Sequence, residues 1–452
     1  MRKAKIYNFW ITVKTSFWFI PSVMILVLFL FSFITLWLDQ FLATQQSLKP
    51  SGITEDSILN ILLAVGPEGA RATLTTVASS MISVAGVTFS ITIVALTLAA
   101  SQLGPRLLRN FMEDKSTQFV LGAFSSTFVY CLLILRSIQS TSTDIFVPTL
   151  SVNISVVLAI VNVGVLIFFI HHISVSLKAE YVIVSVYRHL TSDIDRIFGD
   201  VGSFGKGDIE GFNHSKSQGI GEEYSFEKSI SAITSGYVQA IDHEALMDVC
   251  AGQDWVVKIH VKAGDFSVVG SHIATIQAAS EVGETLLPAI HDAFIYGDQR
   301  TPEQDVEYAI HQMVEIGVRS LSPGINDPFT AISCIDYLSS VMCSLAKKEL
   351  PSFRCYDSSN KVRLVLKPIT YGGLLDSGFN QLRQHCRSSV AVTIRMMDAF
   401  IRIADSLAVD IQKKELLRHV RMLYAEAERH LKDERDRADL ETRYEKCLRK
   451  LA

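Results

Sequence analysis

Long hydrophobic runs dominate the first third of the chain and predict helices that cross a lipid bilayer. About 20 consecutive apolar residues suffice to span the hydrocarbon core. The runs place transmembrane helices near residues 17–38, 73–103, 119–138 and 147–170. We expect no Asp, Glu, Lys or Arg inside the lipid-crossing part of any of them, which argues against a proton relay or an ion-coupled carboxylate site.

The basic residues that flank these runs predict the orientation of the helices. The segment before the first run and the loop after the second carry Arg2, Lys3, Lys5, Lys14, Arg106, Arg109 and Lys115. The other two loops carry only Lys49, Arg71 and Arg136. Because short cytoplasmic loops are enriched in Lys and Arg, both chain termini are expected in the cytoplasm.

The second run is rich in Ser, Thr, Ala and Gly, and some of its hydroxyl residues recur every seven positions. These residues are Thr76, Ser83, Ser90 and Thr97. A seven-residue repeat keeps side chains on one narrow stripe of a helix. The stripe is typical of a helix that lines a polar path, but also of tight packing, since small residues let backbones approach closely in lipid. The two interpretations are compatible if the helices pack around a symmetry axis.

Two basic residues, Arg106 and Arg109, follow this second run. We interpret them as candidates for the inner mouth of such a path, where they would guard the opening or bind anionic headgroups. The alternative is an ordinary solvated end of the helix.

Beyond the membrane runs, the pattern of polar residues changes. Residues 177–225 predict an amphipathic helix followed by a flexible linker rich in Gly, Ser and charge. Residues 226–280 alternate apolar and polar positions around Gly turns, which predicts short strands. Their order resembles the barrel-sandwich hybrid folds of lipoyl and biotinyl domains. The predicted fold class is therefore an α-helical membrane domain of four transmembrane helices, residues 1–176, followed by an α+β cytoplasmic domain containing a small β barrel-sandwich-like module.

A second group of candidate residues lies in residues 281–348, which predict helices, as do most of residues 349–452. Thr301 is the expected N-cap of the first helix, with Gln304 completing a capping box. The candidate cytoplasmic site consists of Asp305, His311, Glu315, Arg319, Asn326 and Asp327. These residues predict either an anion or metal site near a helix N-terminus or a tightly capped helix–turn–helix held by structural ion pairs.

Composition narrows the classes of function. The chain has 452 residues, of which 49% are hydrophobic and 19% charged, and a net charge of -4, which gives no reason to expect a nucleic-acid partner. Its seven cysteines form no C-x-x-C pair and predict free thiols in a reducing compartment, with no metal and no cofactor. No catalytic motif is present, so we do not expect an enzyme.

Two long motifs carry a family resemblance. They are TVASSMISVAGVTFSITIVALTLAASQLGPRLLRNF and RSLSPGINDPFTAISCIDYL. Together they resemble the signatures of a bacterial family of predicted inner-membrane proteins that share a domain of unknown function (family 2254). The resemblance covers nearly the whole chain. It implies a location in the bacterial inner membrane and implies no activity.

From these features we expect a homo-oligomeric, channel-like or transport protein whose cytoplasmic domain forms a vestibule or gate. Its expected partners are the lipid bilayer and further copies of the same chain, and the transported ion or small ligand stays open. The alternative is a membrane-anchored scaffold or sensor whose cytoplasmic domain binds a protein or a small ligand.

Overall fold

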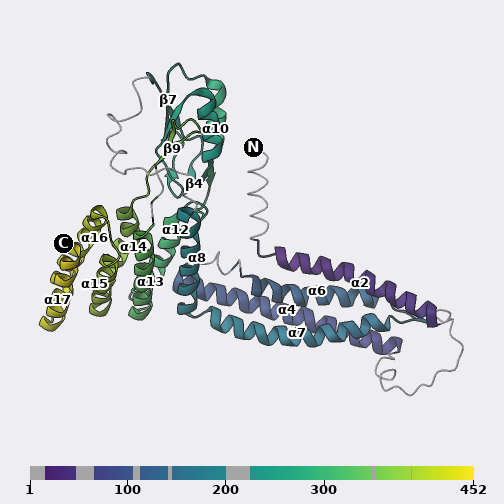
Figure 1. Ribbon diagram of the computed structural model, residues 1–452. Helices are drawn as coiled ribbons and strands as arrows, with labels where there is room; N and C mark the ends of the chain where they lie inside the picture. Colours follow the sequence, from purple (N-terminus) through teal and green to yellow (C-terminus); the bar gives the residue numbers. More distant parts are fainter. Residues whose placement is uncertain are drawn as a thin grey trace. The chain divides into compact units, whose positions relative to one another are not determined.

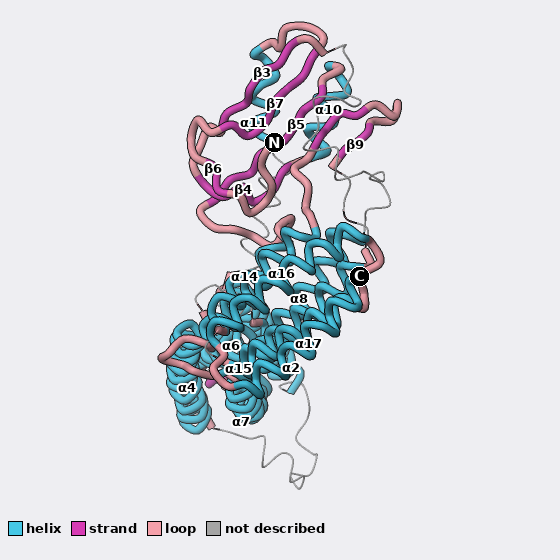
Figure 2. The backbone as a smooth tube through the Cα atoms, turned by 90° about the vertical axis from the view of Figure 1, so that its left-hand side faces the viewer, coloured by secondary structure: helices cyan, strands magenta, loops and turns pink. Residues whose placement is uncertain are grey.

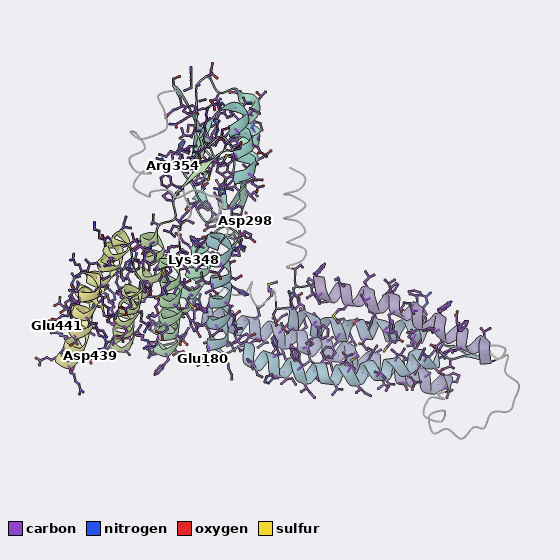
Figure 3. The ribbon with its side chains drawn as sticks, viewed as in Figure 1. Glu180, Asp298, Lys348, Arg354, Asp439 and Glu441 are labelled. Atoms are coloured by element: carbon purple, nitrogen blue, oxygen red, sulfur yellow. The ribbon has the colours of Figure 1, made fainter. Side chains whose placement is uncertain are left out.

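The computed structural model describes residues 16–46, 66–104, 112, 114–140, 145–199, 224–348, 350, 353–387 and 389–452. The chain divides into two compact units, Met1–Lys178 and Ala179–Ala452. Each unit has its own core and is described by itself. The charged side chains that Figure 3 labels, from Glu180 to Glu441, all belong to the second unit.

Long helices make up the described part of the first unit. They are α2 (Phe19–Gln46), α4 (Pro67–Leu103), α6 (Lys115–Ser137) and α7 (Thr149–Ser176). The helix α6 packs against the other three and is the most buried of them, and Figure 1 shows all four side by side. A short antiparallel pair, β1 (Gln139–Ser140) and β2 (Ile145–Phe146), joins α6 to α7. Each predicted transmembrane run therefore lies in a helix.

Among the described residues, five helices are long and apolar enough to cross a membrane, so the predicted number of four is not exact. The fifth is α13 (Pro328–Ala346) of the second unit. It packs against α8 (Ala179–Gly199) and three other helices of that unit. Its Asp336 binds Arg395 and Arg402, each at 2.7 Å. A helix that is apolar on most sides belongs in a membrane or in a protein core, and the neighbours of α13 supply a core.

One carboxylate, Asp39, lies directly beyond the first predicted run. The predicted run stops at residue 38, but α2 continues to Gln46, and the candidate span Phe19–Leu42 includes this residue. Asp39 is only 5% exposed. A buried carboxylate needs hydrogen-bond donors, and the start of α7 provides them.

The second unit contains a stack of helices. After α8 they are α12 (Val306–Ser320), α13, α14 (Tyr371–Cys386), α15 (Val390–Ala404), α16 (Asp410–His430) and α17 (Glu434–Leu451). Figure 1 shows them as neighbouring layers, with α8 against α12 and α13, and α15 against α17. Only Leu177 and Lys178 separate α7 from α8. The chain thus passes from the first unit to the second with almost no linker.

A β module completes this unit, and its described strands form two sheets (Figure 2). The five-stranded sheet has the order β3 (Phe226–Ser231), β7 (His272–Ala278), β5 (Val256–Ile259), β10 (Val362–Val365) and β9 (Arg354–Tyr356). The three-stranded sheet has the order β6 (Phe266–Ser267), β4 (Gly236–Ile241) and β8 (Phe294–Gly297).

The described strands of the β module enclose a main hydrophobic core but do not close into a barrel. Val238, Leu246 of α10 (His243–Gln253), Val257 and Ile276 lie in this core and are fully buried. The barrel-like part of the fold prediction is therefore wrong. The sheet stays open because β10 pairs in parallel with β5 and pairs with β9 along its other edge. Both strands come from beyond α13, outside the stretch that suggested a barrel.

Candidate functional site

The hydroxyl stripe of α4 lies on the face of that helix which the other described helices of the unit leave exposed. Its residues Thr76, Ser83, Ser90 and Thr97 are all exposed. The opposite face buries small and apolar residues, among them Leu74, Ala78, Met81 and Ala85. At Gly86, beside the stripe, an added Cβ would meet no atom within 4 Å. Arg106 and Arg109, predicted at the inner mouth, lie outside the described residues.

Each hydroxyl of the stripe donates a hydrogen bond to its own helix. Thr76 and Ser83 donate to the carbonyl oxygens of Ala72 and Ser79, both at 2.7 Å. Ser90 and Thr97 bond in the same way, to Gly86 and Ile93 at 2.9 Å. A hydroxyl carries one proton and two lone pairs. With the proton used inside the helix, the stripe presents hydrogen-bond acceptors to its surroundings.

A carboxylate from another helix caps the start of α7. Asp39 accepts hydrogen bonds from the backbone N–H groups of Leu150 and Ser151 (2.9 and 3.0 Å) and from the Ser151 hydroxyl (2.6 Å). Pro148, at the N-cap position of α7, makes no side-chain cap. The first N–H groups of a helix need acceptors, and an anion there also interacts favourably with the helix dipole. Sequence reasoning missed this residue because its partners lie far away along the chain.

A second carboxylate holds α7 near its other end. Asp114 caps α6 by accepting from the backbone N–H groups of Ser116 and Thr117. Its Oδ2 also lies 2.7 Å from Nε2 of His172, in the last turns of α7. Between these two anchors, Asn162 of α7 donates to the hydroxyl of Thr127 in α6 (2.8 Å). These polar contacts fix α7 against its neighbours along most of its length.

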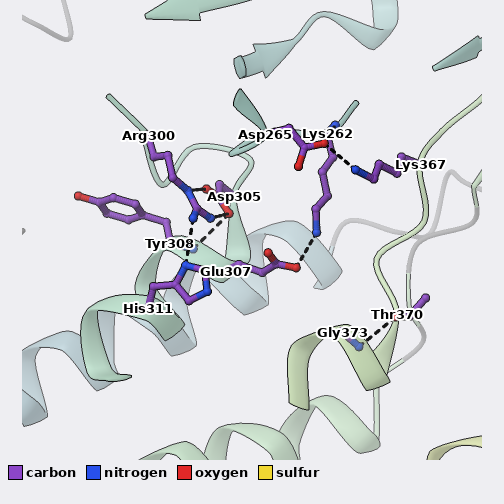
Figure 4. A network of polar contacts seen from close by, with 10 residues as sticks. All are labelled: Lys262, Asp265, Arg300, Asp305, Glu307, Tyr308, His311, Lys367, Thr370 and Gly373. Atoms are coloured by element: carbon purple, nitrogen blue, oxygen red, sulfur yellow. Dashed lines mark hydrogen bonds and ion pairs between the residues drawn. The ribbon is translucent and has the colours of Figure 1, made fainter. Parts of the chain in front are cut away.

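Two of the six candidate residues of the second unit, Asp305 and His311, meet at the junction between the β module and α12 (Figure 4). Asp305 is buried and caps α12 by accepting from the N–H of Tyr308. Two nitrogens of Arg300 donate to its carboxylate at 2.7 and 2.9 Å. A third lies 3.0 Å from Nδ1 of His311. Because a guanidinium can only donate, this Nδ1 is an acceptor and carries no proton.

Two further ion pairs lie at this junction, one of which ties the β module to α12. Lys262 binds Glu307 of α12, and Lys367 binds Asp265 at 2.8 Å. Gly264 lies between these pairs with φ +93, where an added Cβ would fall 2.3 Å from the Asp305 carboxylate. Only glycine fits there, because the position needs both a positive φ and no side chain. Burial raises the pKa of Asp305, and the bonds from Arg300 oppose this rise.

The predicted capping box at the start of α12 is wrong. The helix begins at Val306 with Asp305 as its cap, and not at Thr301. The side chain of Gln304 instead bonds both the N–H and the carbonyl of Ile241 in β4, at 2.9 and 3.1 Å. A contact with a distant strand has replaced the local pairing that the Thr-Pro-x-Gln pattern suggested.

The remaining candidates lie farther along the helices. Glu315 and Arg319 form an ion pair one turn apart in α12, at 3.6 Å. Asn326 occupies the turn before α13 with φ 50, and Asp327 caps α13 by accepting from the N–H groups of Phe329 and Thr330. The carboxylate of Asp327 thus occupies the N-terminus of α13, the kind of position at which the sequence suggested a bound anion. No group of three or more His, Cys, Asp or Glu suited to a metal occurs in the described part of the chain.

Comparisons with known proteins place this geometry in context. The model of the family described as "Predicted membrane protein (DUF2254)" matches residues 14–402. Two uncharacterized proteins, one from Mycobacterium tuberculosis and one from Mycobacterium bovis, are 26% identical to this chain over 396 residues. The match covers 85% of this chain and 74% of each relative. No solved structure matches.

Proposed function

Because the chain belongs to the DUF2254 family of predicted membrane proteins, we propose that it forms a homo-oligomeric channel in the bacterial inner membrane. In this proposal α4 helices from several copies surround a central path. Both termini and the whole second unit lie in the cytoplasm, in agreement with the basic residues that flank the predicted runs.

One observation carries this proposal, the exposure of the hydroxyl stripe on α4. Thr76, Ser83, Ser90 and Thr97 face away from the other described helices of their own unit. The hydroxyl protons are bonded within α4, but the outward lone pairs would find no donor in lipid. If copies of the chain were arranged around an axis, this face would contact water or a solute in the central path.

The direction of the hydroxyl hydrogen bonds bears on which ions the proposed path would pass. Each proton of the stripe is donated to the backbone of α4, so that oxygen lone pairs point outward. Oxygen acceptors replace the hydration shell of a cation, as rings of carbonyls do in cation-selective pores. We therefore propose that the path passes small cations in preference to anions.

Coupling to the second unit follows from chain continuity. Two residues separate α7 from α8, and α8 packs on α12 and α13. Asp39 and His172 hold the two ends of α7 to its neighbours. We propose that a change in the packing of α8 is transmitted to the membrane helices through α7, so that the second unit acts as a gate.

The test is ion flux in liposomes that contain the purified chain. The double variant Ser83→Leu with Ser90→Leu removes two acceptors from the stripe. The matched control, Ile82→Leu with Phe89→Leu, changes two exposed α4 residues with the same spacing on another face. We expect cation flux from the wild type and the control, and none from the stripe variant with its assembly intact. Equal flux in all three would contradict the proposal.

A specific observation also favours the second candidate, a membrane-anchored scaffold or sensor. Every hydroxyl proton of the stripe is bonded inside α4, so this face has no unsatisfied donor. Its side chains are also small, which suits close packing of two α4 helices. Such a packed pair needs no open path. The two candidates differ in the wild type: the channel leaks cations across the liposome bilayer, and the scaffold does not.

A further inference from the structure

The outer face of the β module carries two histidines on neighbouring positions of the five-stranded sheet. His260 follows β5, and His272 begins β7, the strand that pairs with β5 (Figure 2). Their rings lie 4.5 Å apart, centroid to centroid. His272 is exposed and His260 half-buried. Two imidazoles thus sit close together on a surface that solvent reaches.

Both imidazoles point the same nitrogen at one oxygen atom. Nε2 of His260 lies 2.9 Å from the hydroxyl oxygen of Thr275, and Nε2 of His272 lies 3.0 Å from it. The hydroxyl can donate its one proton to one of these nitrogens and accept from the other. A cation that bound both Nε2 atoms would lie beside this oxygen and replace the two hydrogen bonds.

A third group fixes the orientation of one ring. Ser229 of β3 forms a hydrogen bond with Nδ1 of His272. Histidines that bind metals in proteins commonly have their other ring nitrogen held by such a neighbour, which sets both the tautomer and the ring direction. With the proton on Nδ1 donated to Ser229, the lone pair of Nε2 faces the hydroxyl of Thr275.

From this geometry we propose that His260 and His272 form a binding site for one divalent transition-metal cation of the kind that prefers imidazole, namely Zn²⁺, Ni²⁺ or Cu²⁺. A cation between the two Nε2 atoms would take the usual metal–nitrogen distance of about 2.0–2.1 Å. The Thr275 hydroxyl and water complete its coordination. With imidazole and no carboxylate among its ligands, the site discriminates against Mg²⁺ and Ca²⁺.

The electrostatic surroundings favour the neutral form of one of the two rings, that of His260. Burial, the neighbouring His272 and the nearby Lys258 all lower the pKa of His260. A neutral imidazole is the form that binds metals. The same Lys258 works against a bound cation, so the affinity is expected to be moderate and not that of a closed structural site. The site is independent of the proposed channel, because it involves only residues of the β module.

The experiment is calorimetric titration of ZnCl₂ into the purified full-length chain after treatment with a chelator. The test variants are His260→Gln and His272→Asn, which keep polar side chains on the sheet. The matched control is His430→Gln, an exposed histidine on α16 that contacts only a backbone carbonyl in the described structure. We expect one Zn²⁺ per wild-type chain, and a loss of affinity of at least about tenfold in each test variant. The control variant should bind as the wild type does.

Cu²⁺ electron paramagnetic resonance gives a second readout that does not depend on those variants folding. In the wild type we expect hyperfine coupling to two equivalent nitrogens. In Thr275→Val, which keeps both imidazoles, the two-nitrogen coupling should persist. Unchanged Zn²⁺ affinity in a variant that carries both His260→Gln and His272→Asn would overturn the site, as would a wild type that binds none of the three cations at millimolar concentration. A copper signal without nitrogen coupling would also overturn the site.

Discussion

Asp39 of α2 receives two hydrogen bonds from Ser151 of α7, one from its backbone and one from its hydroxyl, at 3.0 and 2.6 Å. Because this carboxylate is buried and caps a helix, we expect Asp39→Ala to lower the free energy of unfolding by about 2 kcal/mol. Asp39→Asn, which keeps one acceptor, should lose less. Thermal unfolding of the detergent-solubilised protein measures the difference.

The matched control for this prediction is Gln40→Ala, the next residue along α2, whose side chain is exposed. It should unfold within about 0.5 kcal/mol of the wild type, as surface substitutions usually do. If Asp39→Ala and Gln40→Ala were equally stable, the carboxylate would contribute no cap, and the helix contact between α2 and α7 would rest on packing alone.

The membrane helices could be predicted from the sequence because lipid imposes a length and an apolar composition on each of them. The contact between Asp39 and Ser151 could not, because residues that lie 112 positions apart leave no local pattern. The same limit applies to the β module. Its alternating strands were predictable from residues 226–280, but the pairing of β10 with β5 depends on a segment that returns after α13.

The ion pair between Arg300 and Asp305 gives a second prediction. Replacing Arg300 by Met removes the two side-chain donors of the buried Asp305 carboxylate, and breaking such a pair typically costs about 3–5 kcal/mol. Asp305→Asn should cost less, because asparagine remains a good N-cap for α12. Urea unfolding followed by circular dichroism would compare the variants.

An exposed ion pair of the same β module is the control. Lys361 and Asp254 lie 3.5 Å apart with both side chains more than half exposed. Lys361→Met should therefore change stability by no more than about 0.5 kcal/mol. A loss in Arg300→Met no greater than in Lys361→Met would contradict the structural role of the buried pair.

The turn before α13 allows a prediction that separates a structural role from a binding role. Asn326 has φ 50, a region that Asn and Gly tolerate but β-branched residues do not. Asn326→Gly should keep the stability of the wild type, and Asn326→Val should lose about 1–2 kcal/mol. Thermal unfolding measures both. A loss in the glycine variant equal to that in the valine variant would mean that the amide side chain, and not the backbone conformation, matters at this position.

Sequence reasoning treated six candidate residues of the second unit as one site, whereas the structure brings only Asp305 and His311 together. Asp305 and Asp327 instead cap α12 and α13. Sequence reasoning assigned the first cap to Thr301, since Thr-Pro-x-Gln is a strong local signal. The bonds between Gln304 and Ile241 of β4 override that signal. Arg300, the residue that joins Asp305 to His311, had no motif to identify it.

Acid should destabilise the second unit through His419 of α16, which is fully buried. Its Nε2 lies 3.2 Å from Asp376 of α14, and its ring packs near Phe400 of α15. The pKa of His419 is lowered to about 4, mainly by burial and also by the neighbouring Arg418, while Asp376 opposes the shift. In the unfolded chain the pKa returns to about 6.5. The stabilising contribution of the neutral ring is therefore complete above about pH 6.5 and is lost as the pH falls toward 4.

We expect the wild type to lose on the order of 3 kcal/mol through this residue between pH 7 and 4. His419→Leu cannot take up a proton at this position, so its stability should fall much less over the same interval. Hydrogen exchange of peptides from α14 and α16, corrected for the intrinsic pH dependence of exchange, reports the change locally. His430→Gln, an exposed histidine on the same helix, should keep the full acid sensitivity. An acid-induced loss in His419→Leu as large as in the wild type would assign the effect to the surrounding Asp376, Glu415 and Arg418 instead.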